Sequence, residues 1–241
     1  MANTQFLMQD KSQQVMRIAE KRQLILDWLK CEGHSSAEIL SQVVGVKGQG
    51  AHNTLKAMLR DGLLRSEDLP TGAKIQLIYG LTPHSAMLAS DFQNNLMVNY
   101  FEPGRVSAWT LQHNLSIQKL RLQLQAEGWT NWKSDRQCKR EGQLNKWLKV
   151  PDSIAITPDG QQVAIEVERS YKSLKRYPEI LANYLQMMKQ QQITCVHYYC
   201  TGQCTAEKMQ AIFHSIKHIK IKGQDVALQP EHHQKFHFFN F

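Results

Sequence analysis

Apolar side chains recur at helical spacing in three segments near the start of the chain. Within residues 17–30 they fall three, four and seven positions apart, which predicts an amphipathic helix that Gly33 ends. Ser35 or Ser36 can cap a second helix, and a third is predicted from about 50 to 61. The positions expected to face the core are Ile18, Leu24, Ile25, Trp28 and Leu29, then Ile39, Leu40, Val43 and Val44, then Leu55, Met58 and Leu59.

A hairpin follows the three predicted helices. A strand starts at 63–65, residues 68–72 carry turn-forming side chains, and 74–81 form a second strand. Three short helices and a hairpin are the layout of a winged helix-turn-helix, whose third helix enters the major groove of DNA. The same fold also serves protein contacts or acts as a structural cap, so that alternative stays open. The side chains expected to contact DNA are Gln49, His52, Asn53, Lys56 and Arg60 on the third helix, and Lys74 in the wing.

A less patterned stretch separates this segment from the rest of the chain. Thr82-Pro83 breaks the second strand of the hairpin, and 84–100 has the composition of a helix. We therefore expect a winged-helix domain at 1–90, a linker at 91–105 and a second domain at 106–241.

Helical and strand-like patterns alternate in this second domain. An apolar helix at 115–126 ends at Glu127-Gly128, and 136–149 is a polar, basic segment with room for a short helix. Pro158-Asp159-Gly160 is a hairpin turn between two strand-like segments. The order of elements predicts an α/β (α+β) domain around a mixed sheet. Strands are expected at 129–133, 153–157, 162–167, 193–200 and 236–241, and later helices at 177–191 and 205–216.

The charge balance narrows the class of partner. The 241 residues include 29 Lys and Arg against 21 Asp and Glu, a formal net charge of +8, and 42% are hydrophobic, which is enough for a core. Residues 1–105 hold 11 basic and 10 acidic side chains, whereas 106–241 hold 18 and 11. This favours nucleic acid as an anionic partner, although a protein that is merely basic has the same balance.

The sequence carries no signal for a membrane. No apolar run reaches the ~20 residues that cross a bilayer, and Met1–Gln14 is polar without a signal-peptide core. We therefore expect a cytoplasmic protein with no membrane segment, whose five cysteines are reduced rather than bridged.

Three acidic residues around the second hairpin form the candidate metal site. Glu166 and Glu168 are two positions apart in a strand, so both point to the face opposite Val167, and the hairpin can fold Asp152 back beside Glu166. Clustered carboxylates repel one another and favour a cation between them. Mg²⁺ or Mn²⁺ held by Asp152 and Glu166 can activate a water and neutralise charge at a scissile phosphate. The alternative is ordinary, because acidic residues are common on the exposed face of a strand.

Basic residues follow the acidic cluster closely. Lys172 lies four residues after Glu168 and can face the same phosphate. Further positive charge for an anionic substrate comes from Arg169, Lys175 and Arg176. The predicted catalytic set is therefore Asp152, Glu166, Glu168 and Lys172.

Pro151-Asp152, the hairpin and Glu166-x-Glu168 resemble the PD-(D/E)xK nuclease superfamily, which has the restriction-endonuclease fold. The sequence departs from that pattern at Glu168, where the family usually has lysine. Some members have glutamate there, and in others the lysine has migrated, for which Lys172 is the candidate.

The stretch from Ala164 to Ser173, with Arg176-Tyr177 and Ile180-Leu181, resembles plasmid mobilisation relaxases of the MobC kind, which look related to the replication-relaxation proteins. The winged helix in front of it strengthens this resemblance. It implies site- and strand-specific nicking at a plasmid transfer origin, within a relaxosome. The implied partners are double-stranded and single-stranded plasmid DNA and the accessory and coupling proteins of that relaxosome.

Other residues leave alternatives open. Many relaxases use a His-hydrophobe-His metal triad and a tyrosine nucleophile, but the sequence has no His-x-His triplet, so hydrolysis by activated water is the more natural mechanism. Tyr171, Tyr177 and Tyr184 remain alternative nucleophiles, and His113 and Glu127 are further candidates at the ends of the 115–126 helix. Zinc is suggested by Cys195, His197, Cys200 and Cys204, but their spacing fits no standard knuckle, and thiols in a strand serve as small hydrophobes.

The sequence therefore predicts a Mg²⁺- or Mn²⁺-dependent DNA-nicking relaxase with a winged helix for recognition. Two rivals remain: a non-enzymatic DNA-binding regulator with a degenerate nuclease fold, and a restriction-type nuclease that cuts both strands.

Overall fold

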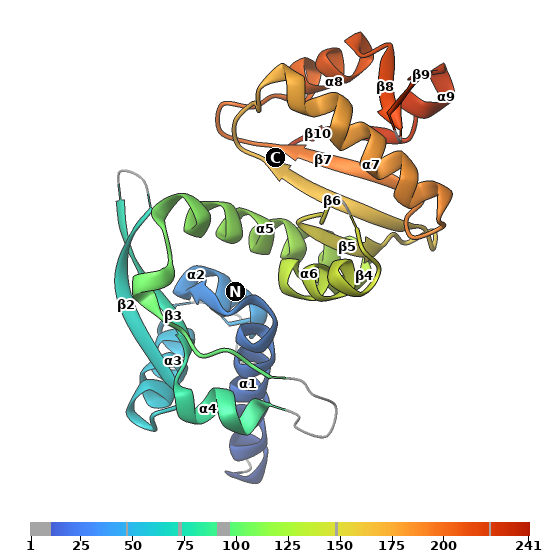
Figure 1. Ribbon diagram of the computed structural model, residues 1–241. Helices are drawn as coiled ribbons and strands as arrows, with labels where there is room; N and C mark the ends of the chain where they lie inside the picture. Colours follow the sequence, from blue (N-terminus) through green and yellow to red (C-terminus); the bar gives the residue numbers. More distant parts are fainter. Residues whose placement is uncertain (1–10, 47, 72–73, 91–96, 148, 222) are drawn as a thin grey trace, which may run out of the picture. The chain divides into compact units, whose positions relative to one another are not determined.

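The computed structural model describes residues 11–241 apart from 47, 72–73, 91–96, 148 and 222 (Figure 1). The chain divides into two compact units, Met1–Leu115 and Ser116–Phe241. The predicted linker 91–105 falls inside the first unit, and its residues 91–96 lie outside the described part of the chain, as do the first ten residues of the polar N-terminus. Among the described residues, no helix combines the length and the apolar character needed to span a membrane.

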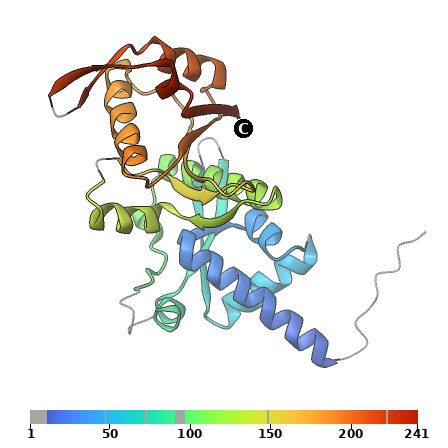
Figure 2. The ribbon, with the colours of Figure 1, turned by 90° about the vertical axis from the view of Figure 1, so that its right-hand side faces the viewer.

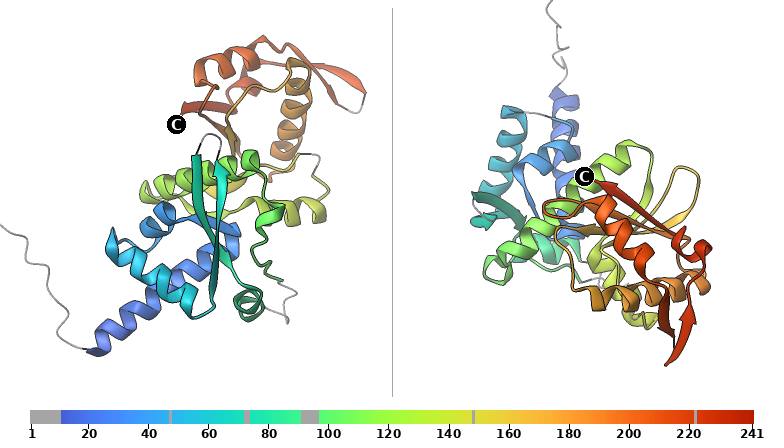
Figure 3. Two further views of the ribbon diagram at one scale, coloured as in Figure 1. Left: turned by 90° about the vertical axis from the view of Figure 1, so that its left-hand side faces the viewer. Right: turned by 90° about the horizontal axis from the view of Figure 1, so that it is seen from above.

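The first unit is a winged helix-turn-helix, as the sequence predicts. The helices of this motif are α1 (Lys11–Glu32), α2 (Ala37–Val43) and α3 (Gln49–Arg60). An antiparallel sheet in the order β1-β3-β2 follows, built from β1 (His34–Ser36), β2 (Leu64–Thr71) and β3 (Lys74–Leu81) (Figure 3). Ser36 caps α2 by accepting a hydrogen bond from the backbone N–H of Ile39.

The core of this unit lies where α1, α2 and α3 meet the sheet, and it includes Ile25, Leu29, Leu40 and Met58. Two positions expected in it are wrong: Ile18 is 53% exposed and Leu24 is 42% exposed. For Ile18 the reason is length, because α1 starts at Lys11 and its N-terminal turns extend past the elements that cover its C-terminal half (Figure 2).

Two further predictions in the first unit need correction. Asp68 to Thr71, expected as a turn, continue β2, and Pro70 is tolerated there because β2 is an edge strand. The hairpin connection at 72–73 lies outside the described residues. The helix expected at 84–100 is α4 (Pro83–Ala89), capped by Thr82; Met97–Tyr100 is irregular, and 91–96 are outside the described part.

The second unit is built on a mixed five-stranded sheet in the order β10-β7-β6-β5-β4 (Figure 1). The neighbours β6, β7 and β10 are parallel, while β5 pairs antiparallel with both β6 and β4. This confirms the predicted mixed sheet and the predicted final strand. The bounds are β4 Thr130–Lys133, β5 Ser153–Ile156, β6 Gln162–Glu168, β7 Cys195–Cys200 and β10 Phe236–Asn240.

Helices cover both faces of this sheet. The last three turns of α5 (Ala108–Ala126) bury Ile117, Leu120 and Leu124 against one face. The opposite face packs against α7 (Tyr177–Lys189), α8 (Ala206–Ser215) and part of α6 (Asp135–Leu144). Helix α5 begins at Ala108 rather than at 115, because Ser107 accepts a hydrogen bond from the N–H of Thr110 and so caps an earlier turn.

A small C-terminal addition was not predicted. Strands β8 (His218–Ile221) and β9 (Gln224–Ala227) pair with each other in a separate ribbon, and α9 (Pro230–His233) leads into β10 (Figure 2). These elements are four residues long, which is too short for a periodic signal. Short 3-10 helices η1 (Pro103–Arg105) and η2 (Leu174–Arg176) complete the described elements.

Candidate nuclease site

Glu166 and Glu168 lie at the carboxyl-terminal end of β6, the middle strand of the sheet. Strand alternation puts Val167 in the core beneath α5 and both glutamates on the face that α7 covers. The alternative considered from the sequence, that the two glutamates lie on an exposed strand face, is therefore wrong, because they are only 3% and 6% exposed. Carboxylates are almost never this deeply buried unless they are paired.

Asp152 lies immediately before β5, beside the same end of β6. Its Oδ2 accepts a hydrogen bond of 2.9 Å from the backbone N–H of Val167, the residue between the two glutamates. Ser153 pairs with Ile165 across the hairpin, which fixes this register. The hairpin thus brings Asp152 next to the glutamates, at the edge where the carboxyl ends of parallel strands meet and where open α/β sheets bind ligands.

Glu166 has two described partners, and both reach its Oε1. Lys149 Nζ lies 2.5 Å away in an ion pair, and the hydroxyl of Tyr184 donates a hydrogen bond from α7. The Lys149 ammonium is also 5.7 Å from the centre of the Tyr184 ring. Sequence reasoning missed Lys149, which it placed in a basic loop, and considered Tyr184 only as core or nucleophile.

Glu168 forms an ion pair with Lys172, four residues later. The chain between them is fixed by Tyr177, whose hydroxyl oxygen accepts a hydrogen bond of 2.9 Å from the backbone N–H of Lys172. Tyr177 is fully buried at the start of α7. The backbone of Lys172 is therefore fixed by this hydrogen bond, and the fixed backbone positions its side chain beside the cluster.

The electrostatic effects join these residues into one cluster. Burial alone would lower the pKa of Lys149, but the carboxylates of Glu166 and Asp152 outweigh burial and raise it. Burial lowers the pKa of Lys172, with opposition from Glu166 and Asp152. Each lysine thus interacts with carboxylates beyond its own hydrogen-bond partner. The three carboxylates and two ammonium groups therefore form one cluster of interacting charges.

The tyrosines and the other helix-end candidates are placed less favourably for chemistry. Tyr177 and Tyr184 are 0% exposed, and burial raises the pKa of both hydroxyls. The hydroxyl of Tyr171 accepts a hydrogen bond from the N–H of Thr205. Glu127 is exposed and accepts a hydrogen bond from Gln123 one helical turn earlier. His113 belongs to the first compact unit.

The residues predicted to bind phosphate lie in the segment between β6 and α7. Lys175 and Arg176 are exposed in η2, and Arg176 is close enough to Lys172 to help lower the pKa of its ammonium group. Arg169 is half-buried, and its carbonyl accepts a hydrogen bond from the N–H of Gln203.

The residues predicted to read DNA form the exposed face of α3. Gln49 donates a hydrogen bond of 2.9 Å to Asn53, one turn later, so the two amides form a pair. Arg60 forms an ion pair with Asp61, which also binds Arg22, and these two arginines lower the pKa of the Asp61 carboxyl. All the predicted contact residues are exposed: Gln49, His52, Asn53, Lys56, Arg60 and Lys74.

None of the five cysteines, all of which the structure describes, is in a disulfide. Cys200 and Cys204 lie in the core on the α7 side of the sheet, whereas Cys195 lies on the α5 side. The four-residue zinc set considered from the sequence is therefore divided between the two faces of the sheet.

The replication-relaxation family matches residues 26–201 of this chain. No curated protein matches it. One similar solved structure is the reduced form of the transcriptional regulator YodB from B. subtilis, with 20% sequence identity and a TM-score of 0.27, over 36% of this chain and 87% of that one. The family match spans most of the chain and includes both α3 and the three clustered carboxylates. The chain therefore belongs to the replication-relaxation family.

Proposed function

We propose that this protein is a metal-dependent DNA-nicking relaxase that acts at a plasmid transfer origin, with a restriction-endonuclease-like second unit. The observation that carries the proposal is the buried cluster at the end of β6. Glu166 and Glu168 form ion pairs with Lys149 and Lys172, and Asp152 accepts a hydrogen bond from the backbone N–H between the two glutamates. A buried acidic cluster with basic partners at the carboxyl edge of a parallel sheet is typical of a binding or catalytic site.

The donor set fits a hard divalent cation. Carboxylate oxygens are the ligands that Mg²⁺ and Mn²⁺ prefer, and Asp152 and Glu166 would hold the ion. Bound there, it would supply Lewis-acid stabilisation of a phosphate and a lowered pKa for a water molecule. Glu168 would hydrogen-bond and orient that water.

The lysines and arginines would hold the DNA strand. Lys172 would donate hydrogen bonds to the scissile phosphate, and the ion pair with Lys149 holds the carboxylate of Glu166 in its orientation. Around them, Arg169, Lys175 and Arg176 would neutralise neighbouring phosphates. The exposed face of α3 would select the origin sequence. Relaxosome accessory and coupling proteins are the partners expected for such an enzyme.

The test is cleavage of supercoiled plasmid that carries the origin, with Mg²⁺, with Mn²⁺ and with a chelator. We expect open circles only when the ion is present, and at least a 100-fold slower reaction for Asp152→Asn and Glu166→Gln, since each would remove an ion ligand. The control is Asp225→Asn, an exposed carboxylate in β9, which should nick at the parent rate. Undiminished nicking by Asp152→Asn and Glu166→Gln would overturn this site, and a linear product would indicate a double-strand nuclease.

One observation favours a second function, that of a non-enzymatic DNA-binding regulator. Glu166 and Glu168 are already paired with lysines, and a purely structural ion-pair network has the same appearance. That function predicts specific, salt-dependent binding and intact supercoiled plasmid with every divalent ion tried.

A further inference from the structure

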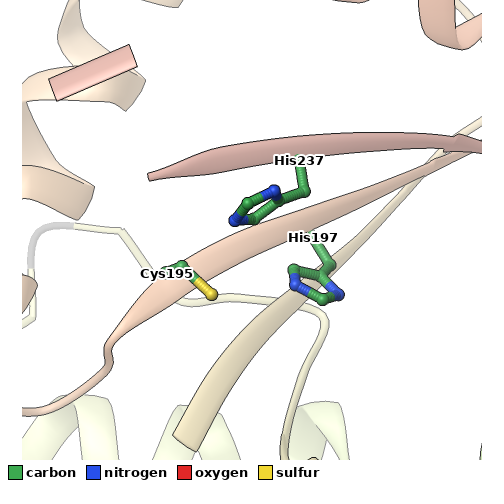
Figure 4. A group of neighbouring side chains, drawn as sticks. All are labelled: Cys195, His197 and His237. Atoms are coloured by element: carbon green, nitrogen blue, oxygen red, sulfur yellow. The ribbon is translucent and has the colours of Figure 1, made fainter. Parts of the chain in front are cut away.

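A second group of possible ligands lies on the other face of the sheet. Cys195 and His197 are two positions apart in β7, so they point to the same side. His237 in β10 is the direct neighbour of His197 across the parallel pair, which places its side chain on that side too. Figure 4 shows the three side chains projecting from two adjacent strands toward one another. The cysteine belongs to the core beneath α5, whereas the glutamates face α7.

The distances between the three side chains suit one metal ion. The Cys195 sulfur and a ring nitrogen of each histidine all lie within 4.8 Å of one another. In a tetrahedral zinc site, bond lengths of about 2.0–2.3 Å put neighbouring ligand atoms about 3.3–3.7 Å apart. Small side-chain rotations would bring the three ligand atoms from separations of up to 4.8 Å to the shorter separations of a zinc site, with no movement of the strands.

His197 has a buried nitrogen that needs a partner. Its Nδ1 has no hydrogen bond to any residue that the structure describes. Aromatic contacts with Trp129, Phe239 and His237, at 5.5, 5.1 and 5.0 Å between ring centres, account for the position of the ring. These ring contacts give the nitrogen no hydrogen-bond partner, and a buried polar atom without a partner destabilises the folded protein.

We propose that Cys195, His197 and His237 bind one Zn²⁺ ion, which fastens the C-terminal strand β10 to β7. A thiolate with two imidazoles is a donor set that zinc prefers over magnesium or calcium. Three protein ligands leave the fourth position for water.

The ion would have a clear structural use. Strand β10 is the edge strand and the last element of the chain, so it has a sheet neighbour on one side only. A bond between residues 40 positions apart along the chain would hold that edge in place. This site is independent of the proposed nuclease activity, because it uses other residues on the other face of the sheet.

The test is titration of the metal-stripped full chain with Co²⁺, a spectroscopic substitute for zinc. We expect one equivalent to produce a thiolate-to-cobalt charge-transfer band in the near ultraviolet, which Zn²⁺ then removes and Mg²⁺ does not. Cys195→Ser should lose the band. His237→Gln, a change at an exposed residue, should weaken cobalt binding at least about tenfold.

Two variants serve as controls. Cys204→Ser removes a thiol on the other side of the sheet, and His218→Gln removes an exposed histidine in β8; both should keep the band. Zn²⁺ should also raise the melting temperature of the parent but not of His237→Gln, since a ligand that binds only the folded state stabilises it. The proposal is wrong if the parent gives no band, if the band persists in Cys195→Ser, or if His237→Gln binds cobalt as tightly as the parent.

Discussion

Two buried tyrosines near Glu166, Tyr184 in α7 and Tyr198 in β7, differ in the hydrogen bonding of their hydroxyl groups. The hydroxyl of Tyr184 donates to Glu166, whereas that of Tyr198 has no hydrogen-bond partner among the described residues. Both side chains are almost completely buried, at 0% and 1% exposed. A hydrogen bond to a charged group is among the stronger contributions to stability, while an unsatisfied buried hydroxyl is a cost.

Tyr184→Phe and Tyr198→Phe should therefore change stability differently. We expect Tyr184→Phe to lower the free energy of unfolding by about 1.5–3 kcal/mol, since it removes a hydrogen bond to a buried carboxylate and leaves Lys149 as the remaining described donor to that oxygen. Tyr198→Phe should change it by no more than about 0.5 kcal/mol, or increase it. Urea unfolding curves with equal slopes would measure both values, and similar losses in the two variants would contradict the hydrogen-bond assignment.

Cysteine reactivity offers a second prediction at this scale. Burial, then the nearby Glu141 and Asp135, raises the pKa of Cys138 to about 12, so at pH 8 almost none of it is the reactive thiolate. In the folded protein at pH 8, we expect a thiol reagent to modify the half-buried Cys31 first and to modify Cys138 only after unfolding. Peptide mapping by mass spectrometry would show the order. Equal labelling rates for Cys31 and Cys138 in the folded protein would refute it.

At the scale of elements, β3 depends on a glycine. Phe101 packs directly on Gly80, where a Cβ atom would lie 2.3 Å from the Cβ of Phe101 and 2.9 Å from the carbonyl oxygen of Gly33. The N–H of Phe101 also donates a hydrogen bond to the carbonyl of Leu81, the last residue of β3. The segment after α4 is thus attached to the sheet at a point that has no space for a side chain.

Gly80→Ala should consequently destabilise the first unit. We expect a loss of about 1–3 kcal/mol, because the new methyl group must displace Phe101 or the strand. Gly104→Ala in η1 is the matched control, since a Cβ there meets nothing within 4 Å, and it should change stability by no more than about 0.5 kcal/mol. Thermal unfolding of both variants beside the parent measures this, and equal melting temperatures for all three would count against the close contact.

The elements also show how far the sequence predicts the structure. The hairpin of β5 and β6 could be predicted because alternating apolar residues flank a Pro-Asp-Gly turn, and the cap of α8 because Thr205 precedes its first turn. Burial of Glu166 could not, since it depends on α7 covering that face. The ion pair of Lys149 with Glu166 could not be predicted either, nor could the position of His237 beside His197. Both contacts exist only because segments far apart in the sequence pack together.

For the whole molecule, the excess of positive charge and the helix proposed to read the DNA sequence lie in different parts of the chain. Residues 1–105, with 11 basic and 10 acidic side chains, contain the exposed face of α3, whereas 106–241 hold 18 basic and 11 acidic side chains. Attraction to phosphates is independent of sequence, and contacts with base edges are not. We therefore expect affinity and specificity for DNA to respond to different substitutions.

Two variants should separate these properties. Lys175→Glu with Arg176→Glu should weaken binding to every duplex and reduce the slope of log K against log salt by about 2. Asn53→Ala should instead lower the preference for the origin over a scrambled duplex by about 1–3 kcal/mol. Fluorescence anisotropy at several salt concentrations measures both quantities.

The control for the double variant is Lys189→Glu with Lys220→Glu, which changes the net charge equally at two other exposed positions. It should lose less affinity than the Lys175/Arg176 variant. If the two double variants lose affinity equally, net charge alone explains the binding, and the residues around η2 have no special part in it.

The number of residues in strand β6 decides which of its side chains face the core and which face the acidic cluster. The core beneath α5 contains Val163, Ile165 and Val167, whereas the cluster beneath α7 contains Glu166 and Glu168. Because the two sets alternate, inserting or deleting a single residue within the strand would send the carboxylates into the apolar layer and the valines into the site. Evolution can therefore vary the length of the turn at 157–161 but not that of β6, and relatives that retain the site should show gaps only on either side of it.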